Sequence, residues 1–334
     1  MLPDAADTAD SAVRVEVLDV LPPDDLEAVT ALVTAATEAD GLHPLSEHVM
    51  LHLPSTTPGP DRHLLVLVTP PGDPHRERLA AYGHLDPTDE VEGSSAELVV
   101  HPQLRGHGIG RVAVDQLQEL SPDGRLRLWA HGQQPAATAL ARSLGYVSAR
   151  ELWQMRRSLR AELPPLELPE GYRLRTFRPG EDDAAWLAVN AAAFADHPEQ
   201  GAWTPADLQH RMAEDWFDPE GFLLLDGPEG DLAGFHWTKV HADEHEPIGE
   251  VYVVGVSPHH QGKGLGRQLT VAGLRHLRGR GLTQAMLYVD ADNTAAVRTY
   301  TRLGFSRWDV DVQFSRPVPT PTPAPPPAVP PSTP

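Results

Sequence analysis

The 334-residue chain contains no cysteine, which excludes disulfide bonds, thiolate metal sites and a thiol nucleophile. It also lacks any apolar run that reaches the ~18 residues of a membrane-spanning helix. Residues 1–10 lack the basic and apolar segments of a secretory signal. Positive charge is scarce, because 27 Lys and Arg stand against 47 Asp and Glu, and the net charge of −20 argues against a nucleic-acid or membrane partner. We therefore expect a cytoplasmic protein.

Proline is abundant, with 34 residues, and its placement suggests how the chain is divided. Residues 316–334 alternate proline with small residues, which predicts a disordered or polyproline-like tail. A second Pro-rich stretch, LPPLELPEG, predicts a linker over 161–171. A length of 334 residues suits two domains, so we predict one at 1–160 and one at 172–315.

The two predicted domains repeat one sequence pattern. A short apolar run and a proline precede a glycine-rich loop at residues 97–110 and again at 254–266. A Leu-Gly-aromatic triplet follows at 144–146 and at 303–305. The offsets are 258 − 102 = 156 at the prolines and 303 − 144 = 159 at the triplets. Two motifs at nearly constant offset indicate a duplicated unit.

Periodicity predicts an α/β unit that occurs twice. Each unit reads as a strand, one or two helices, three strands, the glycine loop, a helix, a strand, a helix and a strand. Predicted helices cover 24–39, 44–53, 136–144 and 265–277. Predicted strands cover 12–20, 64–68, 79–85, 125–131, 222–226, 232–240, 248–257 and 285–290.

The glycine loops predict anion sites. A glycine-rich turn that opens a helix lets the backbone approach a phosphate and directs free N–H groups at it. The spacing matches neither a Walker A loop nor a Rossmann fingerprint. Local positive charge comes from Arg105, His107, Arg111, Lys263 and Arg267.

The loop pattern V-x-P-x-x-Q/R-G-x-G-x-G resembles motif A of the GNAT acetyltransferases, and residues 293–305 resemble their motif B. Longer strings at 97–103, 195–201, 235–241, 249–256 and 287–293 resemble the mycothiol synthases of that family. The resemblance implies two tandem GNAT domains, each a mixed, mostly antiparallel sheet flanked by helices. It also implies acetyl-CoA as co-substrate and the cysteinyl amine of cysteinyl-glucosaminyl-inositol as acceptor.

The resemblance assigns the co-substrate to the central strand, the glycine loop and the motif B helix. In the first half the implied residues are Leu98, Val99, Val100, Gly106, His107, Gly108, Ile109, Gly110 and Arg111. In the second half they are Val254, Gly255, Val256, Gln261, Gly262, Lys263, Gly264, Leu265, Gly266, Arg267, Asn293, Thr294, Ala295, Ala296, Val297 and Arg298. Backbone N–H groups near Val254–Val256 would stabilise the oxyanion.

Two side chains of the second half are candidates for the acid–base chemistry. Glu250, in an otherwise apolar strand, is the candidate base, and Tyr300 is the candidate proton donor to the departing thiolate. A salt-bridged carboxylate and a packed tyrosine are the alternatives. Because no cysteine can hold the acetyl group, the amine would attack the thioester directly. Aligning the repeats places Ser94 opposite Glu250 and Ala141 opposite Tyr300, so we expect a non-catalytic first half.

The implied acceptor contacts are Glu47, Glu199, Lys239, Glu250 and Tyr288, which would place the acceptor near the domain interface. His236, His241 and His245 are spaced five and four residues apart and could be considered for a metal site. The first two fall on a predicted strand and the third in a loop, and the reaction needs no Lewis acid, so we expect no metal. We expect a monomer in which two fused units replace a dimer. The alternatives are acetylation of another amine, such as an aminoglycoside or a protein N-terminus, and a CoA-sensing scaffold.

Overall fold

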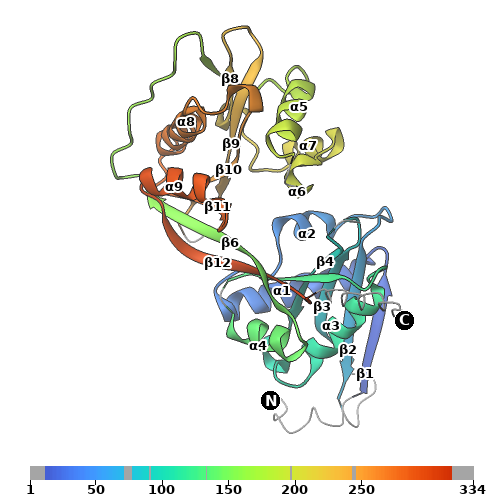
Figure 1. Ribbon diagram of the computed structural model, residues 1–334. Helices are drawn as coiled ribbons and strands as arrows, with labels where there is room; N and C mark the ends of the chain where they lie inside the picture. Colours follow the sequence, from blue (N-terminus) through green and yellow to red (C-terminus); the bar gives the residue numbers. More distant parts are fainter. Residues whose placement is uncertain are drawn as a thin grey trace, which may run out of the picture. The chain divides into compact units, whose positions relative to one another are not determined.

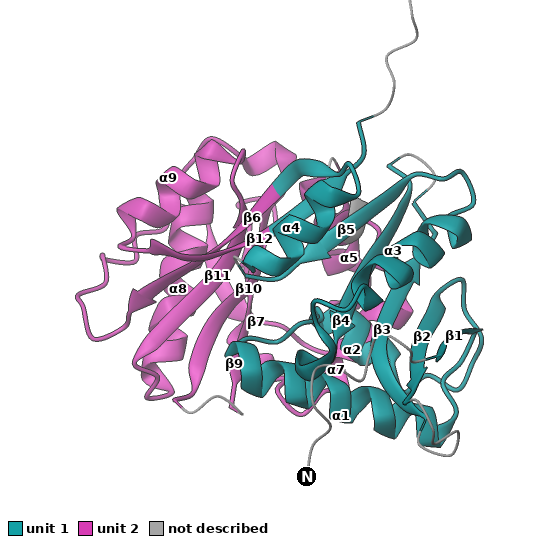
Figure 2. Ribbon diagram, turned by 90° about the horizontal axis from the view of Figure 1, so that it is seen from below, with its two compact units in different colours: residues 1–150, 312–334 teal, residues 151–311 magenta. Residues whose placement is uncertain are grey.

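The computed structural model describes residues 12–70, 77–89, 92–132, 134–195, 198–242 and 246–317. The chain divides into two compact units (Figure 2). Unit 1 comprises residues 1–150 and 312–334, and unit 2 comprises residues 151–311. From residue 318 onward, the predicted tail lies outside the described residues.

Unit 1 is a mixed sheet with helices on both faces (Figure 1). Its strands follow the order β1-β2-β3-β4-β5-β12, and only β4 and β5 pair in parallel. The elements are β1 (Ala12–Leu18), α1 (Pro23–Asp40), α2 (Glu47–His52), β2 (Arg62–Thr69), β3 (Arg78–Asp86), β4 (Ser94–Val100), η2 (Pro102–Leu104), α3 (Ile109–Leu120), β5 (Leu126–Ala130), α4 (Pro135–Ser143) and the end of β12 (Ser306–Ser315).

Unit 2 repeats this plan in the order β6-β11-β10-β9-β8-β7, and only β10 and β11 pair in parallel. The elements are β6 (Val147–Ser158), β7 (Arg173–Thr176), α5 (Asp183–Ala193), α6 (Pro198–Gly201), α7 (Pro205–Met212), η3 (Pro219–Gly221), β8 (Phe222–Asp226), β9 (Leu232–His241), β10 (Ile248–Val256), η4 (Pro258–His260), α8 (Leu265–Gly279), β11 (Gln284–Asp290) and α9 (Thr294–Arg302). The predicted fold class is confirmed.

Each unit takes one strand from the other half of the sequence. β6, which ends the first repeat, pairs with β11 in unit 2 from Leu152 to Ser158. β12, which ends the second repeat, pairs with β5 in unit 1 from Val312 to Ser315. The predicted domains run continuously over 1–160 and 172–315, whereas the compact units exchange these strands. Local patterns indicate a strand but not its partner, which explains the difference.

The predicted linker has no helix or strand and packs along α8. Leu163 is buried in a cluster of unit 2. Arg275 donates a hydrogen bond to the Pro164 carbonyl at 2.9 Å, and the Glu167 N–H donates to the Gln268 side chain at 3.0 Å. The segment is therefore fastened to unit 2 rather than merely spanning from one domain to the next.

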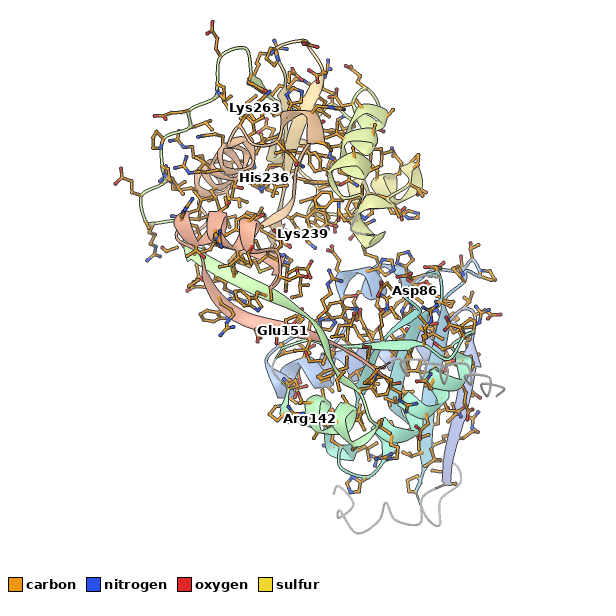
Figure 3. The ribbon with its side chains drawn as sticks, viewed as in Figure 1. Asp86, Arg142, Glu151, His236, Lys239 and Lys263 are labelled. Atoms are coloured by element: carbon orange, nitrogen blue, oxygen red, sulfur yellow. The ribbon has the colours of Figure 1, made fainter. Side chains whose placement is uncertain are left out.

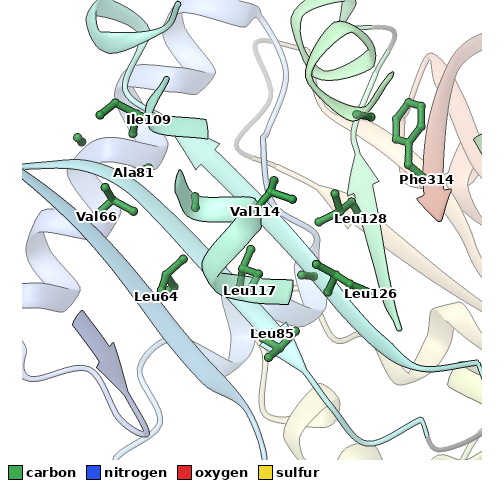
Figure 4. Close-up of a cluster of buried hydrophobic side chains, with 14 of the residues drawn as sticks. Leu64, Val66, Ala81, Leu85, Ile109, Val114, Leu117, Leu126, Leu128 and Phe314 are labelled. Atoms are coloured by element: carbon green, nitrogen blue, oxygen red, sulfur yellow. The ribbon is translucent and has the colours of Figure 1, made fainter. Parts of the chain in front are cut away.

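The cores explain why these sequences form these elements. In unit 1, Ile109, Val114 and Leu117 recur at helical spacing and place α3 against Leu64 and Val66 of β2 (Figure 4). In unit 2, the corresponding apolar residues of α8 pack against the sheet, and an aromatic cluster fills the opposite face under α5 and α7. Within the described ranges, no helix is long and apolar enough to cross a membrane.

Replacing Leu117 tests the packing of α3. The side chain is fully buried, so Leu117→Ala leaves a cavity that we expect to destabilise the protein by about 2–5 kcal/mol. Urea unfolding monitored by circular dichroism would measure this change. The matched control is Glu119→Ala, on the exposed side of the same helix, which should shift stability by less than ~0.5 kcal/mol. Equal effects of the two variants would contradict the packing described here.

Candidate active site

The central strand of unit 2 separates from its parallel neighbour beside Glu250. β10 pairs with β9 along its whole length but with β11 only at Gly249 and Glu250. A register shift between Val251 and Val253 marks a β-bulge at Tyr252. Beyond Glu250, the β11 side of β10 therefore offers backbone N–H and C=O groups that this neighbouring strand does not pair. Such an edge can bind an extended, amide-containing ligand.

In unit 1 the strands separate closer to the glycine loop. β4 pairs with β5 from Ser94 to Glu97, and residues 98–100 pair with β3 alone. In unit 1, the pairing of β4 with β3 places Ser95 opposite Asp86. In unit 2, the pairing of β10 with β9 places Glu250 opposite Lys239. Ser95, not Ser94, is thus the counterpart of Glu250, because the bulge adds one residue to β10. A serine still occupies the position, so this correction leaves the contrast between the units unchanged.

The two glycine loops have the same backbone geometry. Gly106, Gly108, Gly262 and Gly264 adopt left-handed φ values of +80°, +85°, +78° and +75°, and a Cβ on any of them would meet no atom within 4 Å. Gly108 and Gly264 begin α3 and α8 without a side-chain cap, which leaves first-turn N–H groups for a ligand. Each loop therefore leaves the start of its helix open to an anion, and the diphosphate site stays a prediction.

One side-chain hydrogen bond ties each loop back to its strand. Arg105 Nε donates to the Val100 carbonyl at 3.1 Å, and Gln261 Nε2 donates to the Val256 carbonyl at 3.3 Å. The two bonds are related by the 156-residue offset of the repeat. The guanidinium of Arg105 also makes a bidentate ion pair with Asp40, at 2.7 and 2.8 Å. Arg105 thus stabilises its loop and is itself neutralised.

Lys263 is the cation held at the loop of unit 2 (Figure 3). Its ammonium donates to the Tyr172 hydroxyl at 2.9 Å. That hydroxyl lies 2.9 Å from Nδ1 of His260, whose Nε2 lies 2.7 Å from an Asp231 carboxylate oxygen. This chain of hydrogen bonds keeps a positive charge beside the loop.

Glu250 is buried on the central strand and has a defined partner. His241 Nε2 lies 2.7 Å from its Oε2. Lys239, directly opposite on β9, is also buried, and its ammonium lies 4.8 Å from the centroid of the Trp216 ring (Figure 3). Binding Oε2 leaves Oε1 as the oxygen that can take a proton. Glu250 is thus a central-strand carboxylate paired with a histidine, not an edge residue.

Tyr288 lies on β11, which pairs with β10, and Tyr300 lies on α9, which contacts β11. The Tyr288 hydroxyl accepts a hydrogen bond from Gln154 at 2.8 Å. Tyr300 packs against Phe305 on α9, and burial raises the pKa of Tyr300 to about 12. Tyr300 therefore remains a neutral phenol that can donate a proton at physiological pH.

Ala141 is the structural counterpart of Tyr300. The Phe305 N–H donates to the Tyr300 carbonyl at 3.0 Å, and the Tyr146 N–H donates to the Ala141 carbonyl at the same distance. Both bonds close the end of the helix that follows the parallel strand pair. Since alanine has no proton to give, unit 1 lacks this phenol, in agreement with the alignment of the repeats.

The other implied residues lie on three helices. Asn293 caps α9, accepting a hydrogen bond from the Ala296 N–H at 3.1 Å, so residues 294–298 form its first turns. Glu47 begins α2 in unit 1, and the preceding Ser46 N–H donates to Glu97 at 2.6 Å. Glu199 lies in α6, but its side chain is outside the described residues.

The histidines singled out in the sequence have separate roles. His236 is buried, with Nδ1 2.7 Å from the Leu269 carbonyl, and burial lowers its pKa to about 4. His241 contacts Glu250, and His245 lies outside the described residues. In the part of the chain that the structure describes, no three His, Asp or Glu side chains are arranged to hold a metal ion.

Sequence reasoning missed two contacts of this site. His241 appeared only as a possible metal ligand, and Gln154 fell in the other predicted domain. The composition of the chain also points to this site. The chain has only two lysines, Lys239 and Lys263, and both lie among the candidate site residues. With arginine used at every other basic position, this choice points to compact ammonium groups at the site.

The comparison with protein families defines the class. The model of the Acetyltransferase (GNAT) family matches residues 37–146 and again residues 186–305, which together make up more than half of the chain. The chain therefore belongs to the GNAT acetyltransferases, with two copies of the domain, and is an N-acetyltransferase.

Curated relatives show which group of GNAT acetyltransferases the chain is similar to. The mycothiol acetyltransferase of Thermobispora bispora is 55% identical, and the alignment covers 91% of this chain and 99% of the relative. That of Streptosporangium roseum is 52% identical, with coverage of 91% and 99%. These relatives place the chain among the mycothiol acetyltransferases. A solved tandem GNAT protein from the clavulanic acid biosynthesis pathway shares the fold, with a TM-score of 0.67 at 20% identity, and covers 90% of this chain and 98% of its own.

Proposed function

We propose that the chain transfers an acetyl group from acetyl-CoA to the cysteinyl amine of cysteinyl-glucosaminyl-inositol, forming mycothiol. The observation that carries this proposal is the separation of β10 from β11 beside Glu250, with the glycine loop of α8 following the open stretch of β10. The mycothiol acetyltransferase relatives supply the acceptor.

Residues of unit 2 would hold acetyl-CoA in three places. The first-turn N–H groups of α8, around Gly264 and Gly266, would bind the diphosphate, with Lys263 nearby. The open edge of Val254–Val256 would pair with the amides of the pantetheine arm and donate to the thioester oxygen. The first turns of α9 would line the other side of the arm. The loop geometry and the unpaired edge support this arrangement.

The proton transfers would fall to Glu250 and Tyr300. Glu250 takes a proton from the acceptor ammonium, and the resulting amine forms the C–N bond to the acetyl carbon. The C–S bond then breaks as the Tyr300 hydroxyl gives its proton to the departing thiolate, and the second proton of the attacking nitrogen passes to the Tyr300 phenolate as the neutral amide forms. His241 would hold Oε2 of Glu250 so that Oε1 faces the amine. No covalent enzyme intermediate is needed.

The acceptor would contact Lys239, Glu250 and Tyr288, which the strand pairing brings to one face of the unit 2 sheet. Glu47 and Glu199 join this set through the resemblance alone. Carboxylates suit the cationic amine, and the phenol and ammonium suit hydroxyl groups.

Unit 1 would bind CoA without catalysing transfer. Its glycine loop and the free edge of residues 98–100 are present. Serine replaces the base and Ala141 replaces the phenol. Its own buried carboxylate, Glu97, accepts a hydrogen bond from the Ser46 N–H and contacts His131 at 3.2 Å, so it anchors α2. The fused units would act as a monomer.

Purified protein assayed with acetyl-CoA and cysteinyl-glucosaminyl-inositol tests the proposed function. We expect release of free CoA and formation of the acetylated cysteinyl product. An aminoglycoside and a peptide with a free N-terminus serve as the competing amines. Turnover of either competitor without turnover of the cysteinyl compound would contradict the proposal.

Gly264→Ala tests the diphosphate site. A Cβ at this left-handed residue would occupy the space a diphosphate needs, so we expect CoA affinity to fall about tenfold or more. Gly281→Ala is the matched control, because Gly281 has a similar φ of +85° and an equally open Cβ position but follows the C-terminal end of α8. Isothermal titration should show normal CoA affinity for the control. Equal losses in the two variants would mean that backbone strain, not the site, is responsible.

Glu250→Gln tests the base. The amide keeps the size of the side chain but cannot take a proton, so we expect kcat to fall by ~10²–10⁴-fold with little change in CoA affinity. The comparison variant is Glu97→Gln, the histidine-paired carboxylate of unit 1, which should lower kcat by less than ~10-fold. Wild-type turnover by Glu250→Gln across the pH range would rule out the assigned base.

Tyr300→Phe tests the acid. We expect a drop in kcat of about tenfold, smaller than that of Glu250→Gln, because water can partly replace the phenol as proton donor. Since burial raises the pKa of Tyr300 to about 12, the phenol should cause no decline in wild-type kcat up to ~pH 10. A decline below that pH that disappears in Tyr300→Phe would contradict the assignment.

A further inference from the structure

Side chains of three strands continue the sheet face of unit 2 that carries Glu250. Met286 of β11 pairs with Glu250 on one side and with Arg156 of β6 on the other, and Tyr288 pairs with Gln154. Directly paired residues on neighbouring strands project from the same face of a sheet. Gln154 and Arg156 therefore lie on the face of the proposed base and acceptor contacts, although the sequence places them in the first repeat.

These side chains are joined in one chain of contacts. Gln154 Nε2 donates to the Tyr288 hydroxyl at 2.8 Å, and Arg156 Nε donates to Gln154 Oε1 at 2.8 Å. The guanidinium of Arg156 lies over the ring of Trp308 on β12, with Cζ 4.7 Å from the ring centroid. These contacts fix the orientation of all four side chains. We call the set of Tyr288, Gln154, Arg156 and Trp308 the ring row.

The ring row is open to solvent at its aromatic members. Trp308 is 65% exposed and Tyr288 is 41% exposed, and within the described ranges they are the aromatic residues among the exposed large hydrophobic side chains. Arg156 holds the exposed ring of Trp308 in a fixed orientation, so its face is available to a ligand. Aromatic faces pack against the C–H faces of sugar and cyclitol rings, while guanidinium and amide N–H groups donate to ring hydroxyls.

The length of the ring row suits the proposed acceptor. The strand order β10-β11-β6-β12 puts three strand spacings between Glu250 and Trp308, or ~14 Å. A ligand whose amine lies at Glu250 would need an extended, hydroxylated body to reach Trp308. A cysteinyl group followed by two six-membered polyol rings is such a body.

We infer that the ring row is a subsite for the hydroxylated rings of the acceptor. The inference rests on the proposed function, because the amine end of the ligand is placed at Glu250. Its consequence is that the exchanged strand β6 supplies acceptor specificity to the catalytic unit, with Arg156 and Gln154 donating to hydroxyl groups and Trp308 packing on a ring face.

Steady-state kinetics with two acceptors tests the subsite. For Trp308→Ala we expect KM for cysteinyl-glucosaminyl-inositol to rise about tenfold, with kcat changed less than ~3-fold and KM for acetyl-CoA unchanged. With cysteine amide, which has no rings, the variant and the wild type should have equal kcat/KM. Arg156→Ala and Gln154→Leu should show the same difference between acceptors.

Trp153→Ala is the matched control. Trp153 is on the same strand, β6, and lies under the guanidinium of Arg307 at 4.9 Å, but strand alternation places it on the opposite face. Its loss should leave both acceptor KM values unchanged in protein that circular dichroism shows to be folded. An unchanged KM in Trp308→Ala, or equal changes for both acceptors, would overturn the subsite and leave the proposed function intact.

Direct binding separates failure of the subsite from failure of the proposed function. Isothermal titration with glucosaminyl-inositol, which lacks the cysteinyl group, needs no turnover. We expect wild-type protein to bind it and Trp308→Ala to bind it about tenfold more weakly. Equal binding, or no binding to wild-type protein, would overturn the subsite whatever the kinetic assay shows. An absence of turnover with cysteinyl-glucosaminyl-inositol would instead overturn the proposed function.

Discussion

The site of unit 2 depends on one backbone irregularity, the β-bulge at Tyr252. The extra residue ends the pairing of β10 with β11 at Glu250, so the strands separate beside a buried carboxylate. In unit 1, without that shift, β4 stays paired with β5 through Glu97, and a serine stands at the position of the base. A β-bulge re-aims side chains and ends strand pairing, and here a buried carboxylate lies beside an open backbone edge. The proposed proton transfer, the proposed pantetheine site and the ring row are all defined relative to the point where β10 and β11 separate.

The two units share a scaffold and differ at the positions proposed for catalysis. Both units keep the left-handed glycines, the side-chain bond from the loop to the strand, and the hydrogen bond that closes the motif B helix. Each also has a buried glutamate in contact with a histidine, but the two carboxylates do different work. Glu97 accepts the N–H that begins α2, whereas Glu250 contacts His241 at the last residue of β10 that pairs with β11. Differences at equivalent positions, such as Ala141 in place of Tyr300, are the basis for proposing that only unit 2 is catalytic.

Local sequence patterns predicted most of the elements, because apolar periodicity and glycine-proline punctuation are local properties. The helix over 265–277 and the strand over 222–226 agree with α8 and β8. The glycine loops could be located from the sequence because their glycine and proline spacing is also a local property. The sequence did not predict the exchange of β6 and β12, because these strand pairings join residues more than a hundred positions apart. The bulge at Tyr252 was equally hidden, and it moved the counterpart of Glu250 from Ser94 to Ser95. The contact of His241 with Glu250 and that of Gln154 with Tyr288 depend on those pairings.

A crystal structure of the protein with acetyl-CoA tests this account most directly. We predict that the pantetheine arm lies along Val254–Val256 in the opening between β10 and β11. The diphosphate should rest on the N–H groups at the start of α8, and the thioester carbonyl should lie beside the Glu250 carboxylate. Acetyl-CoA bound outside this opening, or Glu250 turned away from the carbonyl, would contradict the account.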